Sequence, residues 1–471
     1  MIWLILLVAL LIRLISLDQS LWLDEAINVL ATQNYSFIGM ITEYAKGDFH
    51  PPGFFILSWF WTRIFGISET AIRIPSVIFG LVTIYFIFLT GVKLHSKKLG
   101  WLCALLLSIN PLHIYYSQEA RMYSLAAMAV SINIFLFIKL IKKEKLNILL
   151  LILANLLILS SDYVAYFIFP AQFILLLTLK QKEILKRWLL ALLSAAVFGI
   201  WWVPIFLSQL DVGAVASAKL PAWKLIVGGF DLKTVPLTFV KFIIGRISYP
   251  DKLIYGLMLL PVSILFLYLL MEGIKFIKGS MRKLILYWLL IPVVLATIIS
   301  LIVPIYSYFR LLFILPAFII LVASGILAFK AKLRFGFLAL VLIIHIFSVS
   351  VYLFNPAFQR DDWRGVVNFL KTQGEAAVLF ESSGTLPPFD YYAKGAINAK
   401  GALKNFPATD VSDIVDLENF LRQGQEVYLI EYLIHISDPR RLVQKRLTDL
   451  NYQEVEIKNF NGVGFVYHYV K

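Results

Sequence analysis

Cysteine and charge are both scarce in this sequence. Cys103 is the single cysteine among 471 residues, so no intrachain disulfide can form and nothing supports a thiol-based or cysteine–zinc site. Only 15% of the chain is charged, whereas 60% is hydrophobic. Soluble domains carry about 25% charged residues. The composition excludes an ordinary soluble protein and indicates a chain that lies mostly within a membrane.

Long apolar runs are abundant. Helices of about 20 apolar residues cross a hydrocarbon core of about 30 Å. The first run, "MIWLILLVALLIRLISL", lacks a basic n-region and a small-residue cleavage site, so we expect a retained span rather than a removable signal peptide. The runs predict a polytopic α-helical membrane protein with about 11 transmembrane helices, at residues 1–17, 71–92, 99–116, 121–141, 146–160, 163–180, 187–207, 253–277, 284–303, 309–329 and 335–354.

The positive charge lies mainly between these runs. The formal net charge of +14 could suggest nucleic acid, but five short basic clusters between spans carry much of it. They are "KLHSKK", "KLIKKEK", "KQKEILKR", "KFIKGSMRK" and "KAKLR". Basic loops face the cytoplasm in membrane proteins. With the N-terminus inside, all five clusters are cytoplasmic, so membrane lipids are expected partners and nucleic acid is not.

Two longer segments fall outside under this topology. The first, 18–70, contains "PPGFFILSWFWTRIFG" from Pro51 to Gly66, which is apolar but short for a span. A span there would move every later basic cluster outside, so we predict an interfacial or re-entrant helix. The second external loop is expected at 208–252. It is mildly basic, and long loops follow the charge rule poorly.

The character of the chain changes after residue 354. Residues 1–354 read as a transmembrane domain, and 355–471 as a small extracytoplasmic α/β domain. In the latter, "DDWRGVVNFLKTQ" and "RRLVQKRLTDL" predict helices. The segments "AAVLFESS", "EVYLIEYLI" and "GVGFVYHYV" predict strands.

Three polar clusters lie on the outer side of the predicted bundle. The first is Asp24 with Glu25, the second is "KGDFHPPG" with His50, and the third is "YYSQEARMYS" with Glu119 and Arg121. Ionisable residues at membrane depth are costly and mark functional sites. Independent clusters from different loops converge on one face at one depth, which favours a shared site.

Each cluster also has a structural interpretation. Asp24 could cap the helix that begins near "EAINVL" by accepting backbone N–H bonds. His50 before two prolines could be an ordinary turn residue. Glu119 and Arg121 could form an ion pair, although residues two apart on a helix face different directions. The sequence leaves these alternatives open.

The residue types together suit one reaction. A carboxylate partly desolvated at a membrane interface has a raised pKa and can take a proton from a hydroxyl. Nearby cations can stabilise the charge of a departing phosphate. This is the chemistry of sugar transfer from a polyprenyl phosphate.

Four motifs in fixed order carry a family resemblance. They are "SLWLDEA", "HPPGFF", "SETAIRIPSVIFGL" and "PLHIYYSQEARMYSL". The set resembles the N-terminal half of GT-C class membrane glycosyltransferases. The likeness is to family 39, the protein O-mannosyltransferase-like group, and to the related lipid A aminoarabinose transferases. It covers the first 170 residues or so, and "YSYFRLLFILPAFIILVA" is a weaker later match.

The resemblance implies an inverting transferase that takes a sugar from a polyprenyl-phosphate donor on the outer face. It assigns the catalytic base to Asp24, with Glu25 as its neighbour, and places Glu119 as the second acidic residue. His50 stands where aminoarabinose transferases have a Lys that contacts donor phosphate, and protein mannosyltransferases also have His-Pro-Pro there. A neutral histidine would hold phosphate less securely than lysine. Arg121 and Arg310 are the further expected phosphate ligands.

The resemblance has limits, and rival interpretations remain. The sequence shows no inserted β-trefoil domain of the eukaryotic protein mannosyltransferases, so a lipid or glycan acceptor is as plausible as a protein. A transporter or lipid-linked sugar flippase is the alternative function, but transporters place ionisable groups near the midplane of related halves. A divalent metal could use the carboxylates and His50, yet their spacing matches no tight motif. We therefore predict neither a metal nor another cofactor.

Overall fold

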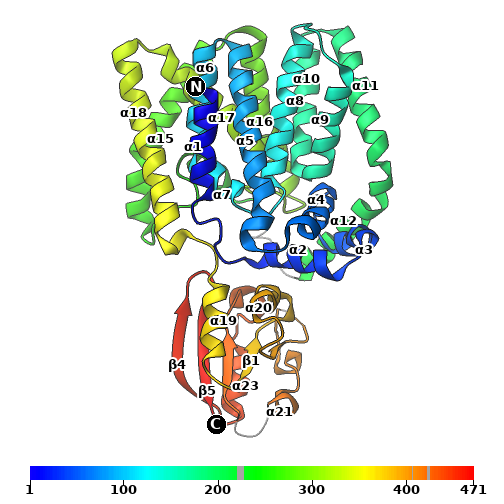
Figure 1. Ribbon diagram of the computed structural model, residues 1–471, viewed down its shortest axis with the longest axis vertical. Coiled ribbons are helices and arrows are strands. Elements are labelled where there is room, and N and C mark those ends of the chain that lie inside the picture. The colour runs from blue at the N-terminus through cyan, green and yellow to red at the C-terminus, as the bar shows by residue number, and fades with distance from the viewer. Residues whose placement is uncertain (220–227, 406, 422–424) are drawn as a thin grey trace.

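The computed structural model describes residues 1–219, 228–405, 407–421 and 425–471. A bundle of long helices stands above a small α/β domain, joined through α18 (Figure 1). The helices of the bundle are α1 (Ile2–Leu14), α5 (Glu69–Leu94), α6 (Lys97–Ser108), α7 (Pro111–Ser117), α8 (Tyr123–Ile141), α9 (Ile148–Ser161), α10 (Ile168–Thr178), α11 (Lys182–Gly199), α12 (Val203–Lys219), α14 (Thr234–Ile244), α15 (Lys252–Phe276), α16 (Gly279–Ser300), α17 (Leu315–Ala328) and α18 (Ala331–Phe354), with short 3₁₀ turns η2 (Tyr163–Phe167), η3 (Ile200–Trp202) and η4 (Leu312–Ile314).

The helical membrane architecture agrees with the prediction, but helix length and composition identify fewer spans than the 11 predicted. Among the described residues, 6 helices are long and apolar enough to cross a membrane, or up to 7 if a bent pair counts as one span. Shorter apolar helices occupy the other predicted spans, at Ile2–Leu14, Ile148–Ser161, Tyr163–Thr178 and Leu312–Ala328. The chain is thus an integral multi-pass membrane protein, and 11 crossings stay a prediction.

The expected straight span at 99–116 is broken. Helices α6 and α7 meet at a bend of 64°. Pro111 cannot continue a helix in its interior but suits a first turn, and the Asn110 side chain accepts from His113 N at 3.0 Å to begin α7. On the other side of the break, Arg13 donates to Ser108 O at 3.0 Å. This bend brings the segment after α7 to the end of the bundle.

The first external segment folds as short helices at that same end. They are α2 (Leu23–Asn34), α3 (Phe37–Thr42), η1 (Tyr44–Gly47) and α4 (Gly53–Phe65). Figure 1 shows α2, α3 and α4 beside one another where the bundle faces the C-terminal domain. The 13-residue α4 is the short apolar helix expected within Pro51 to Gly66.

The second external segment differs from its prediction. We expected the loop to begin at residue 208, but α12 continues helically to Lys219. The polar residues Gln209 and Asp211 therefore lie on a helix, because an apolar helix tolerates a few polar side chains that find partners or reach its solvent end. Part of the predicted loop, 220–227, lies outside the described residues. The loop's remaining part contains α14.

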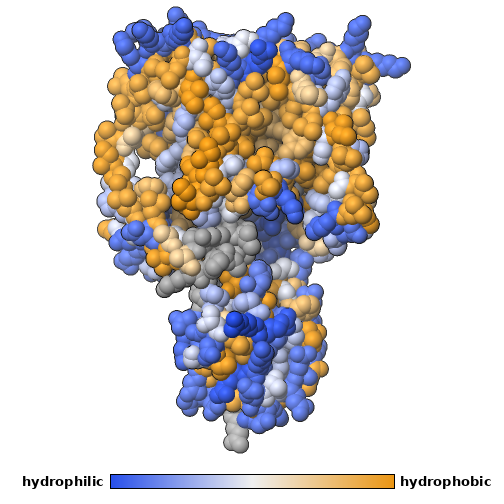
Figure 2. All heavy atoms as spheres, turned by 180° about the vertical axis from the view of Figure 1, so that it is seen from behind, coloured by the Kyte–Doolittle hydropathy of each residue, from blue (hydrophilic) through white to orange (hydrophobic). Residues whose placement is uncertain are grey.

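The two ends of the bundle differ in charge. The five basic clusters connect α5 to α6, α8 to α9, α10 to α11, α15 to α16 and α17 to α18, all at the end remote from the C-terminal domain (Figure 1). Figure 2 shows hydrophilic residues along that rim and a broad hydrophobic band below it. The band is the surface expected to meet lipid hydrocarbon.

The C-terminal domain is a mixed sheet flanked by helices. Its strands are β1 (Ala377–Phe380), β2 (Ala399–Gly401), β3 (Val427–Ile430), β4 (Gln453–Phe460) and β5 (Gly464–Val470), in the order β2-β1-β3-β5-β4. β1 pairs in parallel with β2 and β3, and β5 pairs antiparallel with β3 and β4. The helices and 3₁₀ turns are η5 (Pro356–Phe358), α19 (Trp363–Lys371), η6 (Ser383–Thr385), α20 (Pro387–Ala393), η7 (Val411–Asp413), α21 (Leu417–Phe420), α22 (Ile434–Ser437) and α23 (Leu442–Asp449).

All five elements predicted in this domain are present, as α19, β1, β3, α23 and β5. The prediction omitted β2 and β4. β2 has only 3 residues, and seven of the eight residues of β4 are exposed to solvent. A strand at the sheet edge with no buried face gives no alternation of apolar and polar residues to recognise.

Close glycine contacts hold α15 against α17. A Cβ added at Gly273 would lie 2.0 Å from Leu321 O, and one at Gly325 would lie 1.9 Å from Leu269 O. Small residues allow membrane helices to approach closely, which compensates for the weak hydrophobic drive between helices in lipid. The contact depends on the absence of both side chains.

We predict that Gly273→Ala lowers the free energy of unfolding by about 1–3 kcal/mol, because the new methyl group must push the two backbones apart. Unfolding in mixed detergent micelles measures the change. Gly256→Ala is the matched control on the same helix, where an added Cβ meets no heavy atom within 4 Å. Equal effects of the two substitutions would show that the close contact does not stabilise the bundle.

Candidate active site

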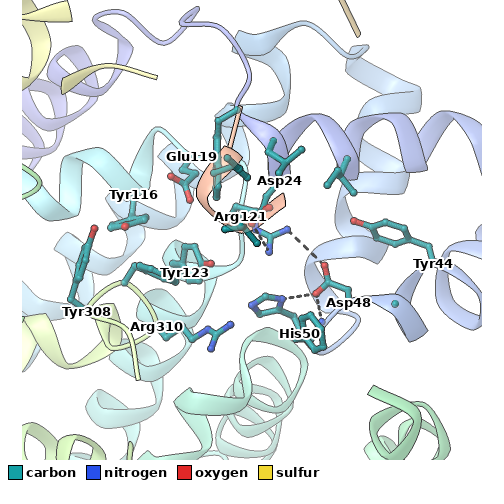
Figure 3. Close-up of a pocket in the computed structure, with 18 of the residues that line it drawn as sticks. Asp24, Tyr44, Asp48, His50, Tyr116, Glu119, Arg121, Tyr123, Tyr308 and Arg310 are labelled. Atoms are coloured by element: carbon teal, nitrogen blue, oxygen red, sulfur yellow. Dashed lines mark hydrogen bonds and ion pairs between the residues drawn. The ribbon is translucent and has the colours of Figure 1, made fainter. Parts of the chain in front are cut away.

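A cavity of about 790 Å³ lies where the bundle, the first external segment and the C-terminal domain meet. It takes residues from all three predicted polar clusters, including Asp24, His50, Glu119 and Arg121. The loop before α17 adds Arg310. Figure 3 shows these side chains turned toward a common space. The structure therefore brings together five of the six predicted site residues.

Asp24 presents its carboxylate to the cavity from the first turn of α2. Trp22 occupies the N-cap position and no side chain caps this helix, so Asp24 does not have the capping role considered above. An acidic residue in a first turn is favoured by the helix dipole. Asp24 Oδ2 lies 3.4 Å from Arg121 Nη2, and 34% of the Asp24 side chain is exposed. Asp24 is thus accessible to a substrate and is held close to a cation.

Asp48 and His50 form a close pair on the other side of Arg121. His50 Nδ1 lies 2.5 Å from Asp48 Oδ1, and Arg121 Nη1 lies 3.9 Å from Asp48 Oδ2. Burial alone would raise the pKa of Asp48, but His50 and Arg121 lower it to about 2. Asp48 is therefore a carboxylate across the physiological pH range, and Figure 3 shows Arg121 between it and Asp24.

Glu119 is paired with an arginine that the sequence analysis did not single out. Arg360, near the start of the C-terminal domain, forms an ion pair with Glu119, and both side chains are 2% exposed. Arg360 also donates to Tyr115 OH at 2.6 Å and stacks over its ring at 3.9 Å. Burial raises the pKa of Glu119, against the opposing influence of Arg360. The Glu119 carboxylate is occupied, so it is less available to a substrate than Asp24.

Two arginines face the cavity without an acidic partner. Among the described residues, no carboxylate forms an ion pair with Arg246 or Arg310. Arg310 donates to Pro304 O and Ile305 O at 3.4 Å, and Arg246 stacks over the Tyr115 ring at 4.6 Å. Arg310 is buried whereas Arg246 is more exposed, and cations without a paired carboxylate favour binding of an anion. They are available to hold a phosphate group.

An aromatic wall lies beside these cations. The ring centroids of Tyr123 and Phe309 are 5.0 Å apart, and those of Tyr116 and Tyr123 are 5.4 Å apart. Tyr308 and Tyr44 also line the cavity. Flat apolar faces next to charged groups suit a ligand that has both a ring and an anionic end.

Glu25 points away from the cavity. Its carboxylate makes two bonds to Arg73, at 2.9 Å and 2.6 Å, and accepts from Ala120 N at 2.7 Å. The Glu25 side chain is fully buried. Burial alone would raise its pKa, but Arg73, Arg360 and the Ala120 amide hold it below the usual value. Glu25 therefore ties three segments together and does not line the cavity, and its predicted catalytic role stays a prediction.

The C-terminal domain closes one side of the cavity. Tyr432, Leu433 and Ile436, in the segment that follows β3, line it. Tyr432 OH donates to Asp361 Oδ2 at 2.9 Å, and Leu433 adopts a left-handed backbone with φ of 58°. Leu23, which precedes Asp24, packs against the same apolar cluster as Tyr432. The domain is thus tied to the helix that carries Asp24.

The candidate metal ligands do not fit a metal ion. Within the described part of the chain, no group of three His, Cys, Asp or Glu residues has a metal-binding arrangement. Their neighbours are instead side chains that donate hydrogen bonds: Glu25 pairs with Arg73, Glu119 with Arg360 and Asp48 with His50.

Arg73, Arg246 and Arg360 were missed by the sequence analysis, and Asp48 was noted but not assigned. Arg360 follows the outer end of the last span, in "FQRDDW", and Arg246 follows an apolar helix in "GRISYP". The argument from the cost of charge near a membrane, applied to Arg121, would also have found these two.

Comparison with solved structures defines the class of fold. The chain is similar to ArnT from Cupriavidus metallidurans in the apo state, with a TM-score of 0.57, 12% sequence identity and coverage of 99% of this chain and 97% of that one. It is equally similar to ArnT bound to undecaprenyl phosphate, with a TM-score of 0.56, 12% identity and coverage of 99% and 97%. Archaeal oligosaccharyltransferase AglB from Archaeoglobus fulgidus has a TM-score of 0.56, 13% identity and coverage of 99% and 74%. The fold is therefore that of GT-C class membrane glycosyltransferases.

Sequence comparison supports the same class over part of the chain. Residues 49–204 match the model of a family described as dolichyl-phosphate-mannose-protein mannosyltransferase. A dolichyl-phosphooligosaccharide-protein glycotransferase of Pyrococcus horikoshii is 30% identical over 145 residues, which are 28% of this chain and 18% of that relative. The resemblance drawn from the motifs is confirmed, and the chain spans less than a fifth of the length of this relative.

We predict that Glu25→Gln destabilises the fold by about 3–5 kcal/mol, because it leaves the Arg73 charge buried without a counter-ion. Unfolding of the purified protein in detergent measures the loss. As a control, Glu183→Gln should leave stability nearly unchanged, since Glu183 forms an exposed pair with Lys186. Full stability of the Glu25 variant together with loss of transfer would instead support a catalytic Glu25.

Proposed function

We propose that this protein is an inverting glycosyltransferase that moves a sugar from a polyprenyl-phosphate donor to an acceptor hydroxyl. The observation that carries the proposal is the cavity itself. An accessible carboxylate, Asp24, shares it with Arg121, with His50, and with Arg246 and Arg310, which have no acidic partner among the described residues. Polyprenyl or dolichol phosphate is bound in the similar structures of ArnT and AglB.

In the proposed reaction, Asp24 accepts the proton of the acceptor hydroxyl. The oxygen then forms a bond to the anomeric carbon while the bond from that carbon to the phosphate oxygen breaks. The electron pair leaves with the phosphate, whose added negative charge is stabilised by Arg121, Arg310 and His50. Because attack and departure occur on opposite faces, the configuration at the anomeric carbon inverts.

We assign the aromatic wall to the donor sugar, and Leu433 and Ile436 of the C-terminal domain to the acceptor. Tyr116, Tyr123 and Phe309 would pack against the donor sugar beside the phosphate site. Leu433 and Ile436 lie on the side of Asp24 and would contact the acceptor, which is a lipid, a glycan or a protein. The sugar is a hexose or pentose.

We place the cavity and the C-terminal domain on the extracytoplasmic side. All five basic clusters lie at the opposite end of the bundle, and basic loops are retained in the cytoplasm. A lipid-linked donor suits this side, because it is anchored in the membrane and no nucleotide sugar then has to cross the bilayer.

The first test replaces the proposed base. Asp24→Asn should lower transfer by about 10²- to 10⁴-fold, because an amide cannot accept the hydroxyl proton. The measurement is mass spectrometry of glycans and lipids from cells that carry either form, with thermal unfolding as the check on folding. Asp18→Asn, in the same segment and exposed, is the matched control and should retain full activity. Full transfer by Asp24→Asn would reject Asp24 as the base.

An assay in proteoliposomes distinguishes the proposed transferase from the alternative function, a flippase or transporter. Proteoliposomes loaded with a labelled polyprenyl-phosphate sugar should form a labelled covalent product. Movement of the labelled lipid across the bilayer without any covalent product would favour the alternative.

We also predict that chelators leave transfer unchanged. Arg121 and Arg310, which line the cavity, supply the positive charge that a divalent ion would otherwise supply to the departing phosphate. Activity of the purified protein after dialysis against EDTA, compared with the same sample after addition of Mn²⁺ or Mg²⁺, provides the measurement. Loss on chelation and recovery with metal would contradict this assignment.

A further inference from the structure

The pair of Asp48 and His50 has a fixed orientation. Because a carboxylate can only accept, the 2.5 Å contact requires the proton of His50 to be on Nδ1. The His50 backbone carbonyl accepts from Gln209 Nε2 at 3.1 Å, and the same amide donates to Ala45 O at 2.6 Å. Pro51 and Pro52 follow directly. Asp48 therefore holds the imidazole ring, and Gln209 holds the backbone of His50.

This orientation leaves Nε2 as the atom of His50 that can meet a ligand. His50 is 4% exposed and lines the cavity, and its Nε2 has no hydrogen-bond partner among the described residues. Figure 3 shows the ring pointing toward Arg310 across the cavity. A buried polar atom without a partner is costly unless a ligand completes it.

The charged groups around His50 come from several elements. Arg121, in the loop before α8, lies behind Asp48, and Arg310 lies across the cavity (Figure 3). Asp24 on α2 reaches His50 only through Arg121. The phenols of Tyr44, Tyr123 and Tyr163 surround the pair, and the Tyr123 ring lies 6.4 Å from the His50 ring. Glu43 also lines the cavity, and Asp162 interacts with Tyr163.

The protonation state of His50 decides what it offers a phosphate. With Nδ1–H directed at Asp48, neutral imidazole presents a lone pair at Nε2, which repels a phosphate oxygen. Imidazolium presents N–H there and donates to that oxygen. The sequence alone made histidine a weaker phosphate ligand than lysine, and the Asp48 carboxylate, 2.5 Å from Nδ1, fixes the ring so that Nε2 faces the cavity.

We propose that Asp48 is a positioning residue that makes phosphate binding proton-linked: His50 takes up one proton from solvent when the donor phosphodiester binds, and its Nε2–H donates to a phosphate oxygen. This inference rests on the proposed function, because it deepens the role of the donor site. No covalent bond forms or breaks in this step. Arg121 and Arg310 supply charge that does not vary with pH, and His50 supplies the part that does.

The direction of the pH dependence follows. Imidazolium is present at low pH, so phosphodiester affinity is highest there and falls as the pH rises. In Asp48→Asn, the amide still accepts from Nδ1–H but carries no charge. The fall in affinity should then occur at lower pH, by about 1–3 pH units. Asp48→Glu keeps the charge and should restore much of the native profile.

Binding of farnesyl methyl phosphate to the full-length protein in detergent tests the proposal. This phosphodiester does not titrate between pH 5.5 and 8.5, so any pH dependence belongs to the protein. Isothermal titration calorimetry in two buffers of different ionisation enthalpy counts the protons taken up. We expect uptake that rises toward one proton as the pH is raised. Asp48→Asn should bind about tenfold more weakly at pH 7.

Variants of His50 and Asp48 distinguish failure of this inference from failure of the proposed donor site. His50→Gln should abolish both the proton uptake and the pH dependence while retaining weak binding through the arginines. Thermal unfolding of each variant excludes loss of fold as the cause. Wild-type affinity that does not vary with pH, or an unchanged profile in Asp48→Asn, would overturn this inference and leave the proposed transferase intact. No binding of the phosphodiester at any pH would instead contradict the proposed donor site.

Discussion

The buried ion pair between Glu25 and Arg73 is the interaction on which the site depends. Arg73 extends from α5 and donates to the carbonyls of Leu17, Gln19 and Ser20 as well as to Glu25. Glu25 accepts in turn from the amide of Ala120. One pair therefore ties the first external segment, a long membrane helix and the loop before α8 together. Asp24 and Arg121, adjacent to these anchors in sequence, meet in the cavity as a result.

In this arrangement, neighbouring charged residues have different roles. Each of two carboxylates, Glu25 and Glu119, is paired with a buried arginine and holds the architecture, since a buried charge without a partner is costly. Asp24 remains accessible. Arg246 and Arg310 remain without acidic partners among the described residues. The stability of the cavity and its capacity to bind an anion therefore come from different members of the same set of charges.

Much of the fold and part of the site could be predicted from the sequence. Apolar run length predicted the membrane helices, and charge asymmetry predicted the end of the bundle that carries the basic loops. Asp24, His50, Glu119, Arg121 and Arg310 were assigned to a common site, and all five line the cavity. The sequence did not reveal that Glu25 lies outside the cavity, because its partner, Arg73, is 48 residues away in the chain. The edge strand β4 was missed because no face of it is buried.

The sequence by itself determined the medium and the chemical inventory. Its hydrophobic content requires a membrane, and its ordered polar motifs supply a carboxylate, a histidine and arginines near one interface. Only the tertiary structure decided which of these charges are free. Adjacent residues such as Asp24 and Glu25 point in different directions on α2, so one faces the cavity and the other meets Arg73. The partners that neutralise or orient a charge come from distant segments, and their contacts are set by three-dimensional packing rather than by spacing along the chain.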